Sequence, residues 1–149
     1  MLGFFVVQPE VAVASVQGSG TSAVCVFDAW LGDELVRCHP MLLVTTPLKV
    51  ALSGVGPTGL TMERARVRRS LFFRRHRPDD RLPAFWALNP AARPGVDDAA
   101  VTDDGSFVVS RRVLDVLMEF RVGRAVFAQY DPPATPPGGA APERAGGGR

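Results

Sequence analysis

The sequence predicts an α+β fold, with a mostly antiparallel sheet of about six to seven strands accompanied by two short helices. Two observations lead to this class. Short segments rich in Val, Phe and Trp recur along the chain between Gly, Pro and Asp, as is typical of strands joined by turns. Two other segments carry apolar residues at helical spacing, each after a Ser or Thr and before a Gly. Because most predicted strands are joined by short turns, α+β is favoured over a doubly wound sheet.

The chain has 149 residues, which suits a single domain, and we expect residues 1–130 to form it. Residues 131–149, DPPATPPGGAAPERAGGGR, consist almost entirely of Pro, Gly, Ala and charged residues. Such a segment buries too little apolar surface to offset the entropy lost on ordering. It is therefore predicted to be a disordered tail.

The N-terminal part is predicted to be β-structure. Residues 3–16 are expected to be extended, residues 18–22 to form a turn, and residues 23–31 to form a second strand. The apolar start could instead be a signal peptide, but it has no basic leader and Pro9-Glu10 interrupts it. An edge strand is the better interpretation. No stretch is long and apolar enough to span a membrane, so we expect a soluble, cytoplasmic protein.

The segment LLVTTPLKVALSGVG, residues 42–56, predicts a short strand followed by a helix. Thr46 stands where a helix N-cap belongs. Pro47 would occupy the first helical position, where its missing N–H has no cost. Gly54 and Gly56 are expected to end the helix.

The middle of the chain predicts two more strands. Residues 60–70, LTMERARVRRS, alternate with the period of two that is typical of a strand. A short aromatic strand is expected at 83–90, followed by a loop at 92–106. Because Trp30 and Trp86 both lie in strand patterns, we expect them to pack in the core rather than to anchor a partner.

The strand–helix plan returns in residues 106–130, SFVVSRRVLDVLMEFRVGRAVFAQY. A strand beginning at Phe107 leads to Ser110, which is placed to cap a helix, and Gly123 is the candidate C-cap before a strand at 125–127. The predicted helix carries one apolar stripe, formed by Val113, Leu114, Leu117 and Phe120. The two units could be copies of one ancestral unit, but few identities favour two ordinary passages.

The most distinctive feature is an arginine-rich segment from Arg64 to Arg81. It holds eight Arg and two Asp, a net charge of +6, whereas the whole chain has a net charge of +2 and the remainder therefore −4. Nucleic-acid-binding proteins are usually basic as a whole. Three interpretations are open: a solvated strand edge and loop, a surface for an acidic protein partner, or a nucleic-acid site in which aromatic rings stack on bases. The candidate partner-binding residues, which we expect in an exposed loop, are Arg74, Arg75, Arg77, Phe72 and Phe73.

No motif for catalysis or for a cofactor occurs. The chain has no nucleophile elbow, no phosphate-binding loop and no dinucleotide-binding fingerprint. Its only histidines, His39 and His76, are too few for a zinc site of known type or for an evident catalytic triad. Ser110 is interpreted as a helix cap rather than a nucleophile. We therefore expect no catalytic residues, no metal site and no cofactor.

Two further groups are given structural roles. Cys25 and Cys38 could form a disulfide, but their spacing matches no known framework and we expect two thiols. The acidic pairs at 97–98 and 103–104 lack the spacing of a cation-binding loop. They are interpreted as solvated turn residues.

Four stretches occur in an order that resembles an immunity-protein family of bacterial polymorphic toxin systems, formerly catalogued as a domain of unknown function. They are AVCVFDAWLGDEL, CHPMLLVTTPLKVALSGVG, GLTMERARVRRS and DDAAVTDDGSFVVSRRVLDVLMEFRVGRAVFAQY, and the resemblance covers about residues 23–130. Relatives in similar systems carry paired C-x-x-C-G motifs, which this sequence lacks.

The resemblance implies a cytoplasmic protein that is not an enzyme and that neutralises a cognate toxin domain by direct contact. It carries over no catalytic residues, and the sequence indicates no oligomeric state. The alternative is a nucleic-acid-binding regulator that uses the segment from Arg64 to Arg81.

Overall fold

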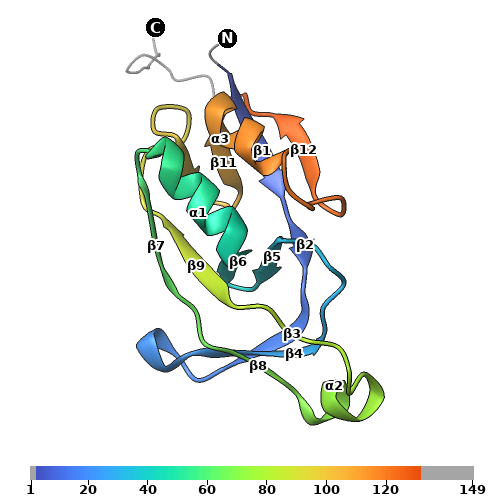
Figure 1. Cartoon of the computed structure of the whole chain (residues 1–149). Coiled ribbons are helices and arrows are strands. Elements are labelled where there is room, and N and C mark those ends of the chain that lie inside the picture. Colours follow the sequence, from blue (N-terminus) through green and yellow to red (C-terminus); the bar gives the residue numbers. More distant parts are fainter. Residues whose placement is uncertain (1–2, 132–149) are drawn as a thin grey trace, which may run out of the picture.

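The computed structural model describes residues 3–131, so the predicted tail at 131–149 lies outside the described residues except for Asp131. Within this range the chain is mostly β, with three α-helices and three small sheets instead of the single sheet that the sequence predicts (Figure 1). The α+β character is retained, because the helices are few and most strand pairs are antiparallel.

The first sheet joins the two ends of the described chain. Its strand order is β10-β11-β1-β12, and all neighbours are antiparallel. The strands are β1 (Phe4–Gln8), β10 (Ala99–Val101), β11 (Phe107–Ser110) and β12 (Val126–Gln129). Because β1 lies between β11 and β12, the N-terminal strand is held on both edges by the C-terminal unit.

The second sheet has the order β2-β5-β6-β9-β7. Its strands are β2 (Glu10–Val11), β5 (Leu35–Cys38), β6 (Met41–Thr45), β7 (Leu60–Arg64) and β9 (Phe85–Pro90). The short strand β2 is parallel to β5, and the other neighbours are antiparallel. The sheet forms the middle layer of the molecule.

The third sheet has the order β3-β4-β8. It consists of β3 (Val13–Gln17), β4 (Val24–Ala29) and β8 (Val67–Arg69), and a 3₁₀ turn, η1 (Gly20–Ser22), lies between β3 and β4. The prediction of one strand over residues 60–70 is wrong. The chain leaves the second sheet after Arg64 and enters the third at Val67, so the regular alternation spans two sheets.

The first long helix, α1 (Thr46–Val55), begins one residue earlier than the sequence predicts. Its N-cap is Thr45 rather than Thr46, and the Thr45 hydroxyl donates to Glu34 Oε1 (2.9 Å) instead of capping the helix. Gly54 lies within the helix. Gly56, with φ of 58°, is the left-handed residue that ends it, as expected.

The helix α3 (Arg111–Leu117) has the predicted N-cap, because Ser110 Oγ accepts a hydrogen bond from the backbone N–H of Val113 (3.4 Å). Its C-cap is Met118, so the prediction of a C-cap at Gly123 is wrong. Phe120 lies beyond the helix and still packs against the core. The apolar stripe therefore continues past the end of the helix.

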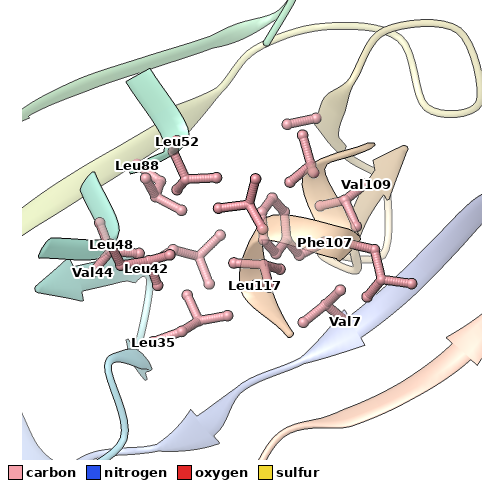
Figure 2. Close-up of a cluster of buried hydrophobic side chains, with 14 of the residues drawn as sticks. Val7, Leu35, Leu42, Val44, Leu48, Leu52, Leu88, Phe107, Val109 and Leu117 are labelled. Carbon is pink, nitrogen blue, oxygen red and sulfur yellow. The ribbon is translucent and has the colours of Figure 1, made fainter. Parts of the chain in front are cut away.

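The larger core lies between the first two sheets and the helices α1 and α3. Figure 2 shows side chains from both sheets and both helices converging on it: Val7, Leu35, Leu42, Val44, Leu48, Leu52, Leu88, Phe107, Val109 and Leu117. Fully burying one such side chain stabilises the fold by about 1.5–3 kcal/mol. This core lies in the upper half of the molecule as drawn in Figure 1.

A second core lies on the other face of the second sheet. In β6, Leu43 belongs to this second core, whereas its neighbours Leu42 and Val44 belong to the larger one. Alternate side chains of a strand point to opposite faces, so β6 is buried on both faces. This explains why its sequence is continuously apolar.

Cys25 of β4 and Cys38 of β5 form a disulfide inside the second core. Their Cα atoms are 6.7 Å apart, and both residues are buried. The expectation of two thiols is wrong for this structure. The disulfide joins the second sheet to the third, and only the packing of those sheets brings the two residues together.

Both tryptophans pack against the cores, as predicted. Trp30 is half-buried against the second core, and its indole N–H donates to the Asp33 carbonyl (2.8 Å). Trp86 is half-buried against the larger core, and its indole N–H donates to Thr46 Oγ1 (3.1 Å).

Candidate interaction surface

The arginine-rich segment forms one end of the molecule. It comprises β8, the short helix α2 (Leu71–His76) and the turn that follows, and Figure 1 shows α2 far from α1 and α3, next to the third sheet. Residues 74–77 are exposed, as predicted, but residues 74–76 belong to this helix and not to a loop. Ser70 caps α2, because its Oγ accepts a hydrogen bond from the Phe73 N–H (3.0 Å). A serine followed by an apolar run was the available signal, but the strand-like alternation before it conceals this cap.

The structure separates the two phenylalanines that the sequence places together. Phe73 is 1% exposed and packs in the second core, so its ring forms no part of the surface. Phe72 is 55% exposed and stacks on His76, with ring centroids 4.1 Å apart. Leu71, which the sequence did not single out, is also 55% exposed. The apolar part of the surface is therefore formed by Leu71 and Phe72.

The three candidate arginines are all exposed but differ in their partners. Arg77 forms an ion pair with Asp80 (Nη1–Oδ2 3.6 Å). Arg74 and Arg75 form no ion pair with any residue in the range 3–131. Because residues 64–81 hold eight Arg and only two Asp, the local positive charge is largely uncompensated.

Two neighbouring arginines form hydrogen bonds within the fold. Arg69 Nη1 donates to the carbonyl oxygens of Pro78 (3.4 Å) and Asp80 (3.1 Å), and its guanidinium lies 5.7 Å from the centre of the Phe73 ring. Arg68 Nη2 donates to Gln17 Oε1 (2.7 Å) and so ties β8 to the end of β3. These contacts fix the turn after α2 against the third sheet.

A surface depression of about 510 Å³ lies beside α2. Its lining combines cations and carboxylates: Val67, Arg68, Arg69, Pro78, Asp79, Asp80, Arg81 and Leu82. Carboxylates in the wall disfavour a polyanion, whereas mixed charges suit another protein surface.

The interpretation of the acidic pairs as solvated turn residues is wrong for Asp98. Its side chain is only 15% exposed and accepts hydrogen bonds from the Thr58 N–H (2.9 Å) and from Arg112 Nη2 (3.1 Å). Partial burial would raise its pKa, but hydrogen bonds from Ser110, Thr58 and Arg112 outweigh this and lower the pKa to about 2. Asp98 therefore ties the segment after α1 to the start of α3.

A second carboxylate contact fastens the connection before β12. Asp33 is buried and accepts from the Arg124 N–H (2.9 Å), while Arg124 Nε lies 3.6 Å from Glu10 Oε2. Burial and the nearby Asp33 raise the pKa of Glu10, whereas Arg124 lowers it. These acids have structural partners, which accounts for their burial.

Among residues 3–131, no three His, Cys, Asp or Glu side chains are grouped so that they could hold a metal ion. No helix in that range is long and apolar enough to cross a membrane.

No protein-family model matches the sequence, no curated protein matches it, and no solved structure matches the fold.

Proposed function

We propose that this chain is an immunity protein that binds a cognate bacterial toxin domain and neutralises it by direct protein–protein contact. It acts by occlusion rather than by catalysis, and it works in the cytoplasm of the cell that it protects. The sequence resemblance over about residues 23–130 supports the class of function.

One structural observation carries the proposal. Arg74 and Arg75 are exposed, have no ion-pair partner among the described residues, and lie on a helix whose Phe73 is anchored in the second core. Arginine is favoured at protein interfaces because its planar guanidinium can bind a carboxylate through two parallel hydrogen bonds. A pair of such groups on an anchored helix is suited to a partner with an acidic face.

The alternative is a nucleic-acid-binding regulator that uses the same arginines. The net charge of −4 outside residues 64–81 weighs against it, because nucleic-acid-binding proteins are usually basic as a whole.

Co-expression is the direct test of the proposal. A candidate toxin domain, sought in the genes next to this one, is produced in bacteria with and without this chain. We expect growth to be restored and the two proteins to co-purify in a stoichiometric complex. Toxicity that persists at equal expression, with no complex, would overturn the proposal.

A charge-reversed variant separates the proposal from its alternative. Arg74, Arg75 and Arg77 are replaced by Glu, and binding to a random-sequence oligonucleotide is measured at several salt concentrations. A nucleic-acid binder would lose affinity linearly on a log–log salt plot, and the variant would abolish binding. We expect weak oligonucleotide binding by the native chain. Tight, salt-sensitive binding without a protein partner would support the regulator instead.

A further inference from the structure

We propose that the outer face of α2 is the docking surface for the toxin domain, and that this partner presents an acidic face with an apolar socket. The inference rests on the proposed function and specifies the contact. We define the outer face as Leu71, Phe72, Arg74 and Arg75, all of which are exposed.

Helical geometry places these residues around the side opposite the core. Successive residues of an α-helix are rotated by about 100°, so Leu71 and Arg75, four residues apart, lie together and away from the buried Phe73. Phe72 and His76 flank them on one side, and Arg74 flanks them on the other. The outer face therefore has Leu71 and Arg75 at its centre, Phe72 on one side and Arg74 on the other.

The aromatic part of this face is already ordered. The Phe72 ring stacks on His76, and His76 Nδ1 lies 3.0 Å from the Phe72 carbonyl oxygen. A side chain held in place before binding loses little conformational entropy in the complex. Phe72 is thus suited to insert into an apolar socket of the partner as an anchor.

The buried side of α2 is also fixed in place. Phe73 packs in the second core with Phe27 and Phe85, and the Ser70 N–H donates to the Phe27 carbonyl (2.8 Å). Arg69 holds the following turn through two carbonyl oxygens. The outer face is therefore a rigid projection rather than a loop that must fold on binding.

The unpaired charges determine the chemistry of the partner. The guanidinium groups of Arg74 and Arg75 have no carboxylate partner within residues 3–131, so carboxylates of another protein can satisfy them. The aliphatic Leu71 beside Phe72 suits an apolar socket in a protein. This face therefore docks on an acidic region of the toxin.

The test measures the affinity of this chain for the candidate toxin domain of the co-expression experiment. Phe72→Ala should weaken binding about 30-fold or more, as expected for an aromatic anchor. Arg74→Glu/Arg75→Glu should slow association about tenfold or more and reverse its salt dependence. The matched controls are Met118→Ala, at a residue that is 60% exposed on α3's C-cap, and Arg93→Glu/Arg121→Glu, which changes the charge equally at exposed sites. The controls should bind like the native chain.

A photo-crosslinking phenylalanine placed at 72 tests the contact without altering charge. It should crosslink to the toxin, whereas the same group at Met118 should not. If the Arg74→Glu/Arg75→Glu variant has a lower melting temperature than the native chain, the variant Arg74→Gln/Arg75→Gln is used in its place.

The outcomes distinguish the two proposals. Formation of a complex with no crosslink at 72 and native affinity in both α2 variants would overturn the docking surface and leave the immunity function intact. Absence of any complex would overturn the proposed function and the docking surface with it.

Discussion

Among single residues, Asp98 shows how one side chain can join three parts of the fold. It accepts hydrogen bonds from Thr58, Ser110 and Arg112, and Arg112 Nη2 also donates to the Gly56 carbonyl (3.2 Å). These contacts connect the end of α1 to the beginning of α3. The carboxylate must be ionised to make them all, so this connection depends on pH.

The expected pH dependence follows from the lowered pKa of Asp98. Its pKa is about 2 in the folded state, compared with an ordinary value of 3.8. A depressed folded pKa means that the stabilisation is present above the unfolded pKa and is lost as pH falls from about 4 toward 2. Asp98→Asn should therefore cost about 1–2 kcal/mol at neutral pH, allowing for solvent screening, and almost nothing near pH 2. Urea unfolding of the native chain and of Asp98→Asn between pH 2 and pH 7 measures the difference in their free energies of unfolding. A difference that does not change with pH would contradict the prediction.

Gly59 and Gly105 form a matched pair for testing backbone strain. Both have positive φ, 77° and 87°. A Cβ on Gly59 would lie 2.2 Å from Ala92 Cβ and 2.9 Å from the Ala99 carbonyl oxygen, whereas nothing lies within 4 Å of one on Gly105. Gly105→Ala should lower the free energy of unfolding by about 1–2 kcal/mol, because alanine disfavours a positive φ. Gly59→Ala should cost about 2–5 kcal/mol, because overpacking adds to the same strain. Equal losses in thermal unfolding would refute the close approach.

At the scale of elements, α3 is held by its apolar stripe and its cap. Leu117 is 1% exposed in the larger core, whereas the adjacent Met118 is 60% exposed. Leu117→Ala should lower the free energy of unfolding by about 2–5 kcal/mol, since it leaves a cavity between the helix and the sheets. Met118→Ala should change it by less than about 0.5 kcal/mol. Chemical denaturation of the two variants measures these changes. A small loss of unfolding free energy in Leu117→Ala would mean that the helix packs differently.

At the scale of the whole molecule, the Cys25–Cys38 disulfide joins the half that holds the larger core to the end that carries α2. The two residues are separated by 13 positions, and closing a loop of this size stabilises a fold by about 3 kcal/mol in the chain-entropy model. Reduction should therefore destabilise the native chain by about that amount. It should also speed amide exchange in β4 and α2 more than in β1 and β11.

The control for reduction is Cys25→Ala/Cys38→Ala, whose unfolding should not respond to a reductant. If a reductant changes neither the unfolding nor the amide exchange of the native chain, the disulfide contributes no stability. Since disulfides are uncommon in the cytoplasm, the proposed location implies that the reduced form also occurs in the cell.

By itself, the sequence determined the features that depend on near neighbours. The cap Ser110, the left-handed Gly56 and the apolar stripe of α3 could be predicted, because capping, glycine conformation and helical spacing act within a few residues. The mixed α+β class and the exposure of Arg74 and Arg75 were also predictable from local composition.

Only the tertiary structure decided what depends on contacts between distant segments. The alternation of residues 60–70 is the same whether they form one strand or two, so the division between sheets depends on which partners β7 and β8 find. Phe72 and Phe73 are identical neighbours, and the packing of α2 on the third sheet alone buries one and exposes the other. Cys25 meets Cys38 and Asp98 meets Arg112 for the same reason: burial and pairing depend on separations in space that spacing along the chain does not contain.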